Sequence, residues 1–454
     1  MTDDDSLGTM MDMIASKRAR IGIFGAGYVG LPLACAFAQA GFATIAGDSD
    51  PEKIRAIRAG ISYVEDDYVL SSLPRLVSSG TLEADSDISR IASLAHFAII
   101  AVPTPLNDRK EPDLSSVIKA SEIISKEIRR GKFVILESSV YPGTTDEVVR
   151  PILEKSGLKA GKDFGLAHSP ERIDYGNRKF GILDIPKVVG GVTPLCTQIA
   201  CELYRSVLRA PVVPVSDTRT AEATKMLENT YRFVNIALVN ELSTFFEKLG
   251  LDSFEVIAAA ATKPFGFQAF YPGPGVGGHC IPKDPQYLAY KARQVGLRLR
   301  LVELSAEIND RMVDHITGRL EENLARQGRS ISGSKAVVLG LAFKADVSDS
   351  RRSPSIALIE RLADRGIHVE AYDPLVRSVR TKRGELFSAE SLERCAEGAD
   401  ILVLATPHAL FRHIDLKKLS ARMRPNPVMV DTRGFWSRAE CESAGFDYLG
   451  LGRA

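Results

Sequence analysis

The feature that most constrains the fold is a glycine pattern near the start of the chain, Gly25-Ala26-Gly27-Tyr28-Val29-Gly30, which directly follows an apolar run at 20–24. Residues 31–40 have helical spacing and small side chains, and a second apolar run at 43–47 ends at Asp48. This order predicts a strand, a helix and a strand, with the glycines at the helix N-terminus. Free amides and the helix dipole favour an anion there, so the pattern predicts a dinucleotide pyrophosphate site.

Asp48 indicates which dinucleotide is bound. A carboxylate at the end of the second strand can accept hydrogen bonds from ribose hydroxyls and would repel a 2′-phosphate, so NAD is favoured over NADP. The candidate cofactor-binding residues are Gly25, Gly27, Tyr28, Val29, Gly30 and Asp48, with Pro103 and Thr104 after a later strand.

Continuous apolar runs at 97–102 and 133–136 are typical of parallel strands buried on both faces. The C-terminal third repeats the order of elements in runs at 336–340, 368–373, 400–407 and 428–431. Between them lie long amphipathic helical stretches at about 216–250, with Met226, Phe233, Ala237 and Leu238 on its apolar positions, and at about 299–326. We therefore expect an α/β protein in which two Rossmann-like, doubly wound parallel-sheet domains are joined by a helical central domain.

The expected divisions are a flexible N-terminal extension (1–17), a dinucleotide-binding domain (18–212), a helical central domain that dimerises (213–325) and a second Rossmann-like domain (326–454). The second copy keeps Gly340 but lacks the other two glycines and has Lys344 nearby. A lysine offers a point charge where bare backbone would be needed, which favours a phosphate-bearing ligand other than a second dinucleotide.

A second glycine-rich segment, Gly273-Pro274-Gly275-Val276-Gly277-Gly278-His279-Cys280, cannot continue a helix and predicts a tight loop that presents a thiol. A free cysteine is often simply a buried small hydrophobe. The bare amides of the glycines and the nearby Lys283 instead favour a reactive thiolate. With a nicotinamide site in the same chain, this predicts oxidation of an alcohol to an acid through a carbon–sulfur intermediate.

Other polar positions are less decisive. Lys225, Asn229 and Arg232 share one face of the long helix, which is either a solvated face or a set of donors that stabilise an oxyanion. The segments 137–143 and 168–172 follow strands, where doubly wound folds bind ligands. On the residues alone, the roles of both segments and of His279 stay open.

Composition excludes several classes of protein. The formal net charge of +1 gives no global attraction to nucleic acid or to an anionic membrane, and no apolar run approaches the ~20 residues that span a bilayer. Six scattered cysteines predict neither a disulfide framework nor a metal site, and residues 1–17 lack the apolar core of a signal peptide. We expect a cytoplasmic protein, and the long helix suits a homodimer or higher oligomer.

Four segments in this order, 25–32, Ser169-Pro170-Glu171-Arg172, 227–241 and the cysteine loop, resemble the UDP-glucose/GDP-mannose dehydrogenase family of nucleotide-sugar 6-dehydrogenases. The resemblance covers essentially the whole chain after residue 18. The resemblance implies two hydride transfers to NAD, with Cys280 as the nucleophile that holds a thiohemiacetal and then a thioester. It implies that Asp284 orients water or assists proton transfer and that Lys225 and Asn229 stabilise developing charge. It also implies that Glu171 acts in thioester hydrolysis. Ser139 stands where UDP-glucose members of the family carry a threonine, so a hydroxyl is kept at this position. The implied substrate-binding residues are Glu171, Arg172, Lys225, Asn229, Arg232, Gly277, Lys344 and Arg433.

His279 and the segment 262–267 look like the branch that acts on UDP-N-acetylhexosamines, UDP-N-acetylglucosamine in particular, and the implied product is a uronic acid for surface polysaccharide. Tyr175 and Lys283 depart from that branch, so UDP-glucose and UDP-N-acetylmannosamine are the alternative substrates. A non-catalytic NAD-binding scaffold would require loss of Cys280 or its expected partners, all of which are present.

Overall fold

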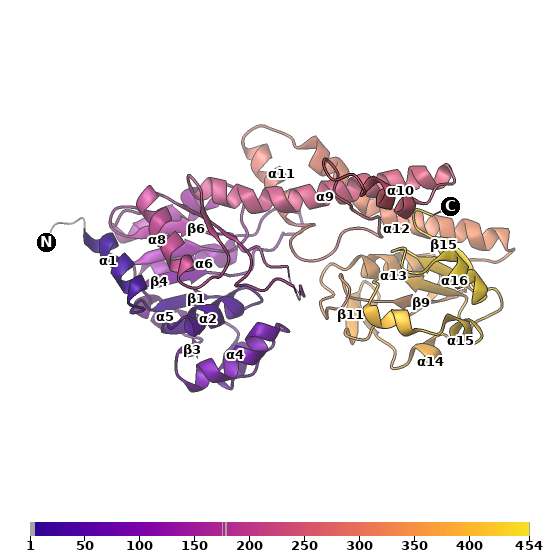
Figure 1. The fold of residues 1–454 in the computed structure, drawn as a ribbon, viewed down its shortest axis with the longest axis horizontal. Coiled ribbons are helices and arrows are strands. Elements are labelled where there is room, and N and C mark those ends of the chain that lie inside the picture. The colour runs from indigo at the N-terminus through magenta and orange to yellow at the C-terminus, as the bar shows by residue number, and fades with distance from the viewer. Residues whose placement is uncertain (1–4, 175, 178, 454) are drawn as a thin grey trace. The chain divides into compact units, whose positions relative to one another are not determined.

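The computed structural model describes residues 5–174, 176, 177 and 179–453, so Tyr175 lies outside the described residues. The chain forms two compact units, Met1–Glu228 with Gln286–Leu297 and Asn229–Pro285 with Arg298–Ala454. The expected central segment 213–325 is divided between them, and the division falls within one long helix, α9 (Thr218–Lys248). Each unit contains its own sheet, which is mainly parallel in the first unit and parallel in the second (Figure 1).

The sheet of the first unit has the strand order β3-β2-β1-β4-β5-β6-β7-β8. Its strands are β1 (Ile21–Phe24), β2 (Thr44–Gly47), β3 (Leu82–Asp85), β4 (Phe97–Ile100), β5 (Phe133–Leu136), β6 (Gly165–His168), β7 (Lys187–Gly191) and β8 (Val212–Pro214). The first six strands are parallel in the order of a dinucleotide-binding fold, whereas β7 runs antiparallel to β6.

Continuous apolar runs form these strands because helices cover both faces of the sheet. Ile23 and Ile99 belong to the hydrophobic core on one face, and Phe24 and Ile100 belong to the core on the other. The pattern that predicted parallel strands therefore reports burial on both sides, and the predicted fold class is confirmed.

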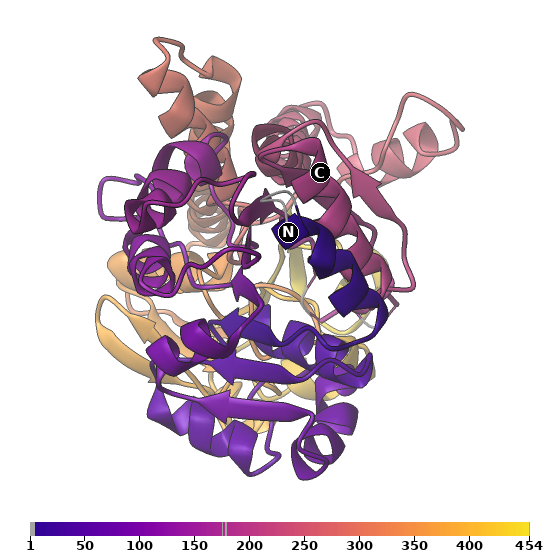
Figure 2. The ribbon, with the colours of Figure 1, turned by 90° about the vertical axis from the view of Figure 1, so that its left-hand side faces the viewer.

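Helices α1 to α8 belong to this unit: α1 (Asp5–Ala15), α2 (Gly30–Gln39), α3 (Pro51–Arg58), α4 (Asp67–Ser78), α5 (Ile88–Leu94), α6 (Ser115–Ser125), α7 (Arg150–Leu153) and α8 (Pro194–Arg205). Short π and 3₁₀ turns, η1 (Thr145–Val149) and η2 (Glu154–Ser156), flank α7. The expectation of a flexible extension at 1–17 does not hold for the described part. Helix α1, drawn in indigo (Figure 2), contacts α8 and buries Leu7, Met10 and Ile14 in the core. The sequence signal for this helix is the spacing of Leu7, Met10 and Ile14, which are three and four residues apart and therefore share one helix face.

The second unit repeats the plan with five parallel strands in the order β10-β9-β13-β14-β15. They are β9 (Lys335–Leu339), β10 (His368–Tyr372), β13 (Ile401–Leu404), β14 (Val428–Asp431) and β15 (Asp447–Gly450), with a separate hairpin of β11 (Ser378–Thr381) and β12 (Gly384–Phe387). From β9 the next strand in the chain, β10, is added on one side and the later strands, from β13 on, are added on the other side. Doubly wound sheets bind ligands at such a switch point. The predicted repeat of the N-terminal architecture is confirmed.

The remaining helices are α10 (Ser253–Ala260), α11 (Asp284–Gln294), α12 (Arg300–Arg326), α13 (Pro354–Asp364), α14 (Leu392–Cys395), α15 (Leu416–Ser420) and α16 (Arg438–Ser443), with a 3₁₀ turn η3 (Ala409–His413). On α9, Met226, Phe233 and Ala237 are buried as expected. Leu238, which we expected on the same apolar face, is 49% exposed.

Candidate active site

Each glycine of the first loop has a distinct structural reason. Gly25 has φ +102°, and a methyl group on it would lie 2.6 Å from the carbonyl oxygen of Ala101. A methyl on Gly30 would lie 1.8 Å from the carbonyl oxygen of Gly25, so helix α2 packs too closely on the loop for any side chain. A methyl on Gly27 would meet no described atom within 4 Å, which leaves its backbone open to a ligand. These properties fit the pyrophosphate of NAD.

Asp48 is fixed beside this loop at the end of β2. Its carboxylate accepts hydrogen bonds from the amides of Ala26 (3.0 Å) and Asp50 (3.0 Å) and pairs with Lys53 Nζ at 3.1 Å. The side chain is therefore oriented where the sequence predicted an acceptor for ribose hydroxyls. On the glycine loop, Tyr28 is exposed and Val29 is half-buried.

Thr104 and Ser139, at the carboxyl ends of β4 and β5, lie together. Thr104 Oγ1 donates to the carbonyl oxygen of Ser139 (2.8 Å), and the carbonyl of Thr104 accepts from the hydroxyl of Tyr287 on α11 (2.6 Å). Ser139 is half-buried, while Pro103 is exposed. The structure thus brings two predicted residues to one edge of the sheet.

The loop after β5 is held by Glu222 of α9. Its carboxylate accepts from the amides of Gly143 (2.5 Å) and Thr145 (2.7 Å) and from Thr145 Oγ1 (2.7 Å). Burial raises the pKa of Glu222 to about 7, although these hydrogen bonds oppose the shift.

Glu171 lies beyond the end of β6 in a buried cluster of charges. Its Oε1 accepts from the amides of Arg172 (2.7 Å) and Ile173 (2.6 Å), and its Oε2 lies 3.5 Å from Lys187 Nζ. Lys187 also pairs with Glu137 at 2.8 Å, and Glu137 accepts from the hydroxyl of Tyr204. Burial raises the pKa of Glu137; for Lys187 burial acts in the opposite sense, but the two carboxylates outweigh it and raise its pKa.

Arg172 was expected to bind substrate. In the structure its guanidinium donates to Glu228 through Nε (3.1 Å) and Nη2 (2.5 Å), and Nη1 donates to the carbonyl of Pro186 (2.6 Å). These contacts anchor the loop after β6 to α9. The substrate-binding role of Arg172 stays a prediction.

In the second unit, the cysteine loop is pressed against residues 343–354. Gly278 has φ +88°, and a methyl on it would lie 2.8 Å from Phe343 Cε2; a methyl on Gly277 would lie 2.6 Å from Pro354 Cδ. Only glycine satisfies both the backbone conformation and this close packing. Of the six free cysteines, Cys280 alone is not fully buried, and His279 Nδ1 lies 3.8 Å from its sulfur.

A turn leads from Cys280 into α11, because its carbonyl accepts from the amides of Lys283 (3.1 Å) and Asp284 (2.8 Å). The carboxylate of Asp284 accepts from Asn229 Nδ2 at 2.7 Å and lies 3.6 Å from Lys283 Nζ, and both charged side chains are fully buried. The structure therefore joins Asn229 to Asp284, as the predicted site requires. Lys225, one turn earlier on α9, is buried in the first unit, whereas Arg232 is exposed. The solvated-face interpretation of the helix is thus wrong for Lys225.

At the carboxyl edge of the second sheet, the loop after β9 differs from a dinucleotide loop. Asp373, the counterpart of Asp48, accepts from the amides of Leu341 (2.6 Å) and Ala342 (3.1 Å) and from His408 Nε2 (3.1 Å). Burial opposes its charge, but His408 and the amides outweigh it and lower the pKa of Asp373 to about 2. Lys344, half-buried, follows in the same loop.

Arg433 extends from the end of β14 toward the cysteine loop. Its Nε donates to the carbonyl of Ala405 (3.1 Å), and a methyl on Gly273 would lie 2.5 Å from its Nη1. Burial lowers the pKa of this guanidinium to about 10, with Asp431 acting in the opposite sense. The predicted nucleotide-binding arginine is thus next to the loop that presents Cys280.

Sequence reasoning missed Lys187 and Tyr204. The available signal was the lysine that opens an otherwise apolar strand, since a lysine within a fully buried sheet needs a buried partner.

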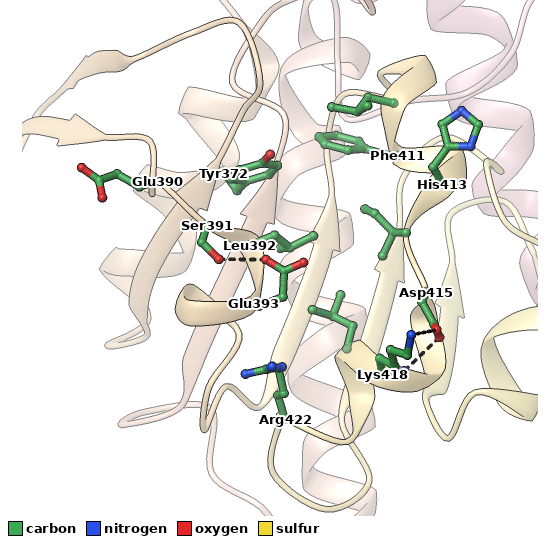
Figure 3. Close-up of a pocket in the computed structure, with 13 residues that line it drawn as sticks. Tyr372, Glu390, Ser391, Leu392, Glu393, Phe411, His413, Asp415, Lys418 and Arg422 are labelled. Atoms are coloured by element: carbon green, nitrogen blue, oxygen red, sulfur yellow. Dashed lines mark hydrogen bonds and ion pairs between the residues drawn. The ribbon is translucent and has the colours of Figure 1, made fainter.

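A separate cavity of about 490 Å³ lies between α14 and α15 of the second unit (Figure 3). None of its lining residues is a predicted site residue. Charged groups at its rim are paired locally, Lys418 with Asp415 at 3.3 Å and Glu393 with Ser391 at 2.8 Å. Among the described residues, no group of three or more His, Cys, Asp or Glu side chains could hold a metal ion, and no helix is long and apolar enough to cross a bilayer.

A dinucleotide loop in one sheet, a second nucleotide-type sheet and an accessible cysteine with an asparagine–aspartate pair define a nicotinamide-dependent oxidoreductase. Three family models match in succession: the NAD-binding domain at residues 19–208, the central domain at 219–311 and the UDP-binding domain at 337–438. The chain belongs to the UDP-glucose/GDP-mannose dehydrogenase family, whose members are NAD-dependent nucleotide-sugar dehydrogenases.

Similar proteins cover nearly the whole chain. A UDP-N-acetyl-D-mannosamine dehydrogenase of Pyrococcus horikoshii is 34% identical over 96% of this chain and 99% of its own length. A UDP-N-acetyl-D-glucosamine 6-dehydrogenase of Pseudomonas aeruginosa is 34% identical over 92% and 97%. The solved structure of the UDP-D-ManNAc dehydrogenase from P. horikoshii matches with a TM-score of 0.88 at 34% identity, covering 96% of this chain and 99% of that one.

Proposed function

We propose that this protein oxidises the C6 alcohol of a UDP-N-acetylhexosamine, UDP-N-acetylglucosamine in particular, to the uronic acid in the cytoplasm, as a step toward surface polysaccharide. The observation that carries the proposal is the partly exposed Cys280 on a glycine loop whose next turn ends at the buried Asp284, which accepts a hydrogen bond from Asn229 of α9. A thiol that a substrate can approach closely is what a covalent two-stage oxidation needs.

The proposed reaction has four balanced steps. NAD, when bound, accepts one hydride in each of two oxidations. The first oxidation removes a hydride from C6 and the hydroxyl proton, which leaves an aldehyde. The thiol of Cys280 adds to the aldehyde, its sulfur bonding to the carbon and its proton going to the oxygen, to form a thiohemiacetal. Removal of the second hydride from this carbon and of the hydroxyl proton then gives a thioester. Water then adds to the thioester carbon, the carbon–sulfur bond breaks, and the acid leaves with Cys280 restored.

The other residues manage charge and protons in these steps. Lys225 and Asn229 donate to the substrate oxygen as negative charge develops on it. Asp284, oriented by Asn229 at 2.7 Å, assists proton transfer, and Glu171 takes a proton from the hydrolytic water. Ser139 offers a hydroxyl, while Lys344, Arg433, Gly277, Arg172 and Arg232 contact the nucleotide sugar.

The choice of an acetamido sugar is supported by His279 and the segment 262–267, and by the names of several relatives. Those relatives include the UDP-N-acetylmannosamine and UDP-N-acetylglucosamine dehydrogenases above and an NDP-N-acetyl-D-galactosaminuronic acid dehydrogenase of Ralstonia solanacearum, 33% identical over 92% of this chain. UDP-N-acetylmannosamine and UDP-glucose are the alternative substrates.

Initial rates of NADH formation with UDP-N-acetylglucosamine, UDP-N-acetylmannosamine, UDP-N-acetylgalactosamine and UDP-glucose test the proposal. We expect the highest kcat/KM with UDP-N-acetylglucosamine and two NADH for each acid formed. Cys280→Ser should still bind NAD and UDP-sugar but lose turnover. Acid production by that variant at the wild-type rate would remove the covalent mechanism, and no turnover with any UDP-sugar would favour a non-catalytic scaffold.

We also propose a homodimer formed through α9. Apolar side chains spaced by three and four residues are exposed along one face of this helix and in the turn that follows its end at Lys248: Leu238 (49%), Leu242 (37%), Phe245 (53%) and, in the turn, Leu249 (56%). This spacing is that of a helix–helix seam, and a second copy presents the same stripe. Sedimentation should show that Leu242→Glu dissociates the dimer, while Leu410→Glu, at a more exposed leucine (53%) on η3, does not. A monomeric wild-type protein would refute this assignment.

A further inference from the structure

The buried charge cluster around Glu171 is built by the strand direction in the first unit. Because β7 runs antiparallel to β6, with His168 opposite Gly190, its first residue lies beyond the carboxyl end of β6. Continuing this register brings Lys187 opposite Glu171. The reversal of β7, which β8 follows in parallel, therefore delivers an ammonium group to the edge where ligands bind.

The cluster contains one more carboxylate than ammonium groups. Lys187 Nζ lies 2.8 Å from Glu137 and 3.5 Å from Glu171, and all three side chains are at most 8% exposed. Glu137 is further held by the hydroxyl of Tyr204. Glu137 thus holds the ammonium group of Lys187 in place, at a position from which the same group also faces Glu171.

Glu171 itself is only half-satisfied. Oε1 accepts two backbone amides, whereas Oε2 is buried and has no hydrogen-bond partner among the described residues. A buried carboxylate oxygen without a donor is costly unless a ligand or water occupies the position. That oxygen is the atom available to a water molecule.

We propose that Lys187 is a positioning residue, whose ammonium group lies 3.5 Å from Oε2 of Glu171 and fixes this carboxylate where it can accept a proton from the hydrolytic water. This inference rests on the proposed function of Glu171 in thioester hydrolysis. Lys187 touches no reacting atom and acts only through Glu171. In hydrolysis the water oxygen bonds to the thioester carbon, Glu171 takes the proton, and that proton is returned to the departing sulfur.

Other titratable groups surround the cluster and must be considered in any pH profile. Glu137 and Tyr204 face Lys187 from β5 and α8, and Arg172 is paired with Glu228 of α9. His168 is buried nearby, where burial and the charges of Lys225 and Lys187 lower its pKa to about 3, so it stays neutral in the assay range.

The test compares Lys187→Met with Lys187→Arg and with a matched control, Lys132→Met. Lys132 precedes β5, whereas Glu137 follows it, so the control removes another buried lysine at the opposite end of the same strand. Misplacing a catalytic group by about 1 Å can cost roughly 100-fold in rate, so loss of the ammonium group that lies 3.5 Å from Glu171 should lower kcat at least tenfold.

Rapid mixing of Lys187→Met with NAD and UDP-N-acetylglucosamine should give a normal burst of two NADH per active site, followed by slow turnover. Intact mass should show the sugar adduct on Cys280 accumulating. Lys187→Arg should restore part of the rate, and Lys132→Met should keep the wild-type profile. In a Glu171→Gln background, Lys187→Met should have no further effect on hydrolysis.

Three results would overturn the inference: an unchanged kcat in Lys187→Met, equal loss of the burst and of steady turnover, or additive effects with Glu171→Gln. If Lys187→Met does not fold, equal loss of the burst and of steady turnover in Lys187→Arg would overturn it. Failure of the wild-type protein to form two NADH per sugar would instead refute the proposed function.

Discussion

The buried His168 should make the first unit sensitive to acid in a way that one substitution removes. Burial, followed by the positive charges of Lys225 and Lys187, lowers the pKa of His168 from 6.5 to about 3. The folded state therefore holds the ring neutral while the unfolded chain binds a proton below pH 6.5. The free energy of unfolding is therefore highest above the unfolded-state pKa of 6.5, and it decreases as pH falls toward the folded-state pKa of about 3.

The shift from 6.5 to about 3 corresponds to a total of about 5 kcal/mol at 1.36 kcal/mol per unit. Integrating the linkage between about pH 7 and about pH 5 gives a loss of roughly 2 kcal/mol. His168→Leu cannot bind this proton. The stability difference between variant and wild type should therefore shift by roughly 2 kcal/mol in favour of the variant over that interval.

Scanning calorimetry at the two pH values measures the effect, with the transition of the first unit identified by its rise on adding NAD. At about 2–4 °C per kcal/mol, the relative Tm of His168→Leu should rise by about 4–8 °C at the lower pH. His368→Gln, at a histidine whose side chain is 72% exposed, is the control and should show no such change. A Tm difference between His168→Leu and wild type that is equal at both pH values would refute the reasoning.

Three further substitutions test other parts of the structure. Gly278→Ala forces a left-handed backbone (φ +88°) on alanine and places its methyl 2.8 Å from Phe343, so kcat and the alkylation rate of Cys280 should fall about tenfold while the fold is kept. In Asp373→Asn the side-chain NH₂ group would face backbone NH groups, since both carboxylate oxygens of Asp373 accept from backbone amides. Urea unfolding followed by Trp436 fluorescence should therefore show a free energy of unfolding of the second unit about 2–3 kcal/mol lower. Met10→Ala should destabilise the first unit by about 2–5 kcal/mol in calorimetry, and no loss would show that α1 does not contribute to the core.

The fold was largely predictable because its strands are buried on both faces. Runs such as 133–136 and 428–431 coincide with β5 and β14, since an uninterrupted apolar run has no other stable place in a soluble chain. Helix α1 was missed, and Leu238 was assigned to the wrong face of α9. A hydrophobic pattern states that a face is apolar, but not which partner covers it.

The site was predictable only where one residue type is required by its chemistry or backbone. The glycines and Cys280 could be chosen in this way, whereas Asp284 was named only through the family resemblance. A lysine that opens an apolar strand signals a buried partner, but the identity of that partner follows from the antiparallel register that places Lys187 opposite Glu171, and register is a tertiary property. Likewise, nothing in the local sequence showed that Arg172 would bind Glu228.

The two sheets show why equal topology does not give equal ligand binding. Asp48 takes a single loop amide, that of Ala26, and the backbone at Gly27 stays open. Asp373 takes two loop amides and is itself fixed by His408, so the donors that a pyrophosphate would need are already used.

Glycine content alone should therefore not create a second dinucleotide site. Ala342→Gly restores the glycine that corresponds to Gly27, but Asp373 still occupies the amides of Leu341 and residue 342 and still carries its charge. Equilibrium dialysis should give one NAD per chain for both wild type and Ala342→Gly, with unchanged affinity. A second bound NAD in the variant would mean that the methyl group of Ala342, rather than the carboxylate of Asp373, excludes a dinucleotide from the second sheet.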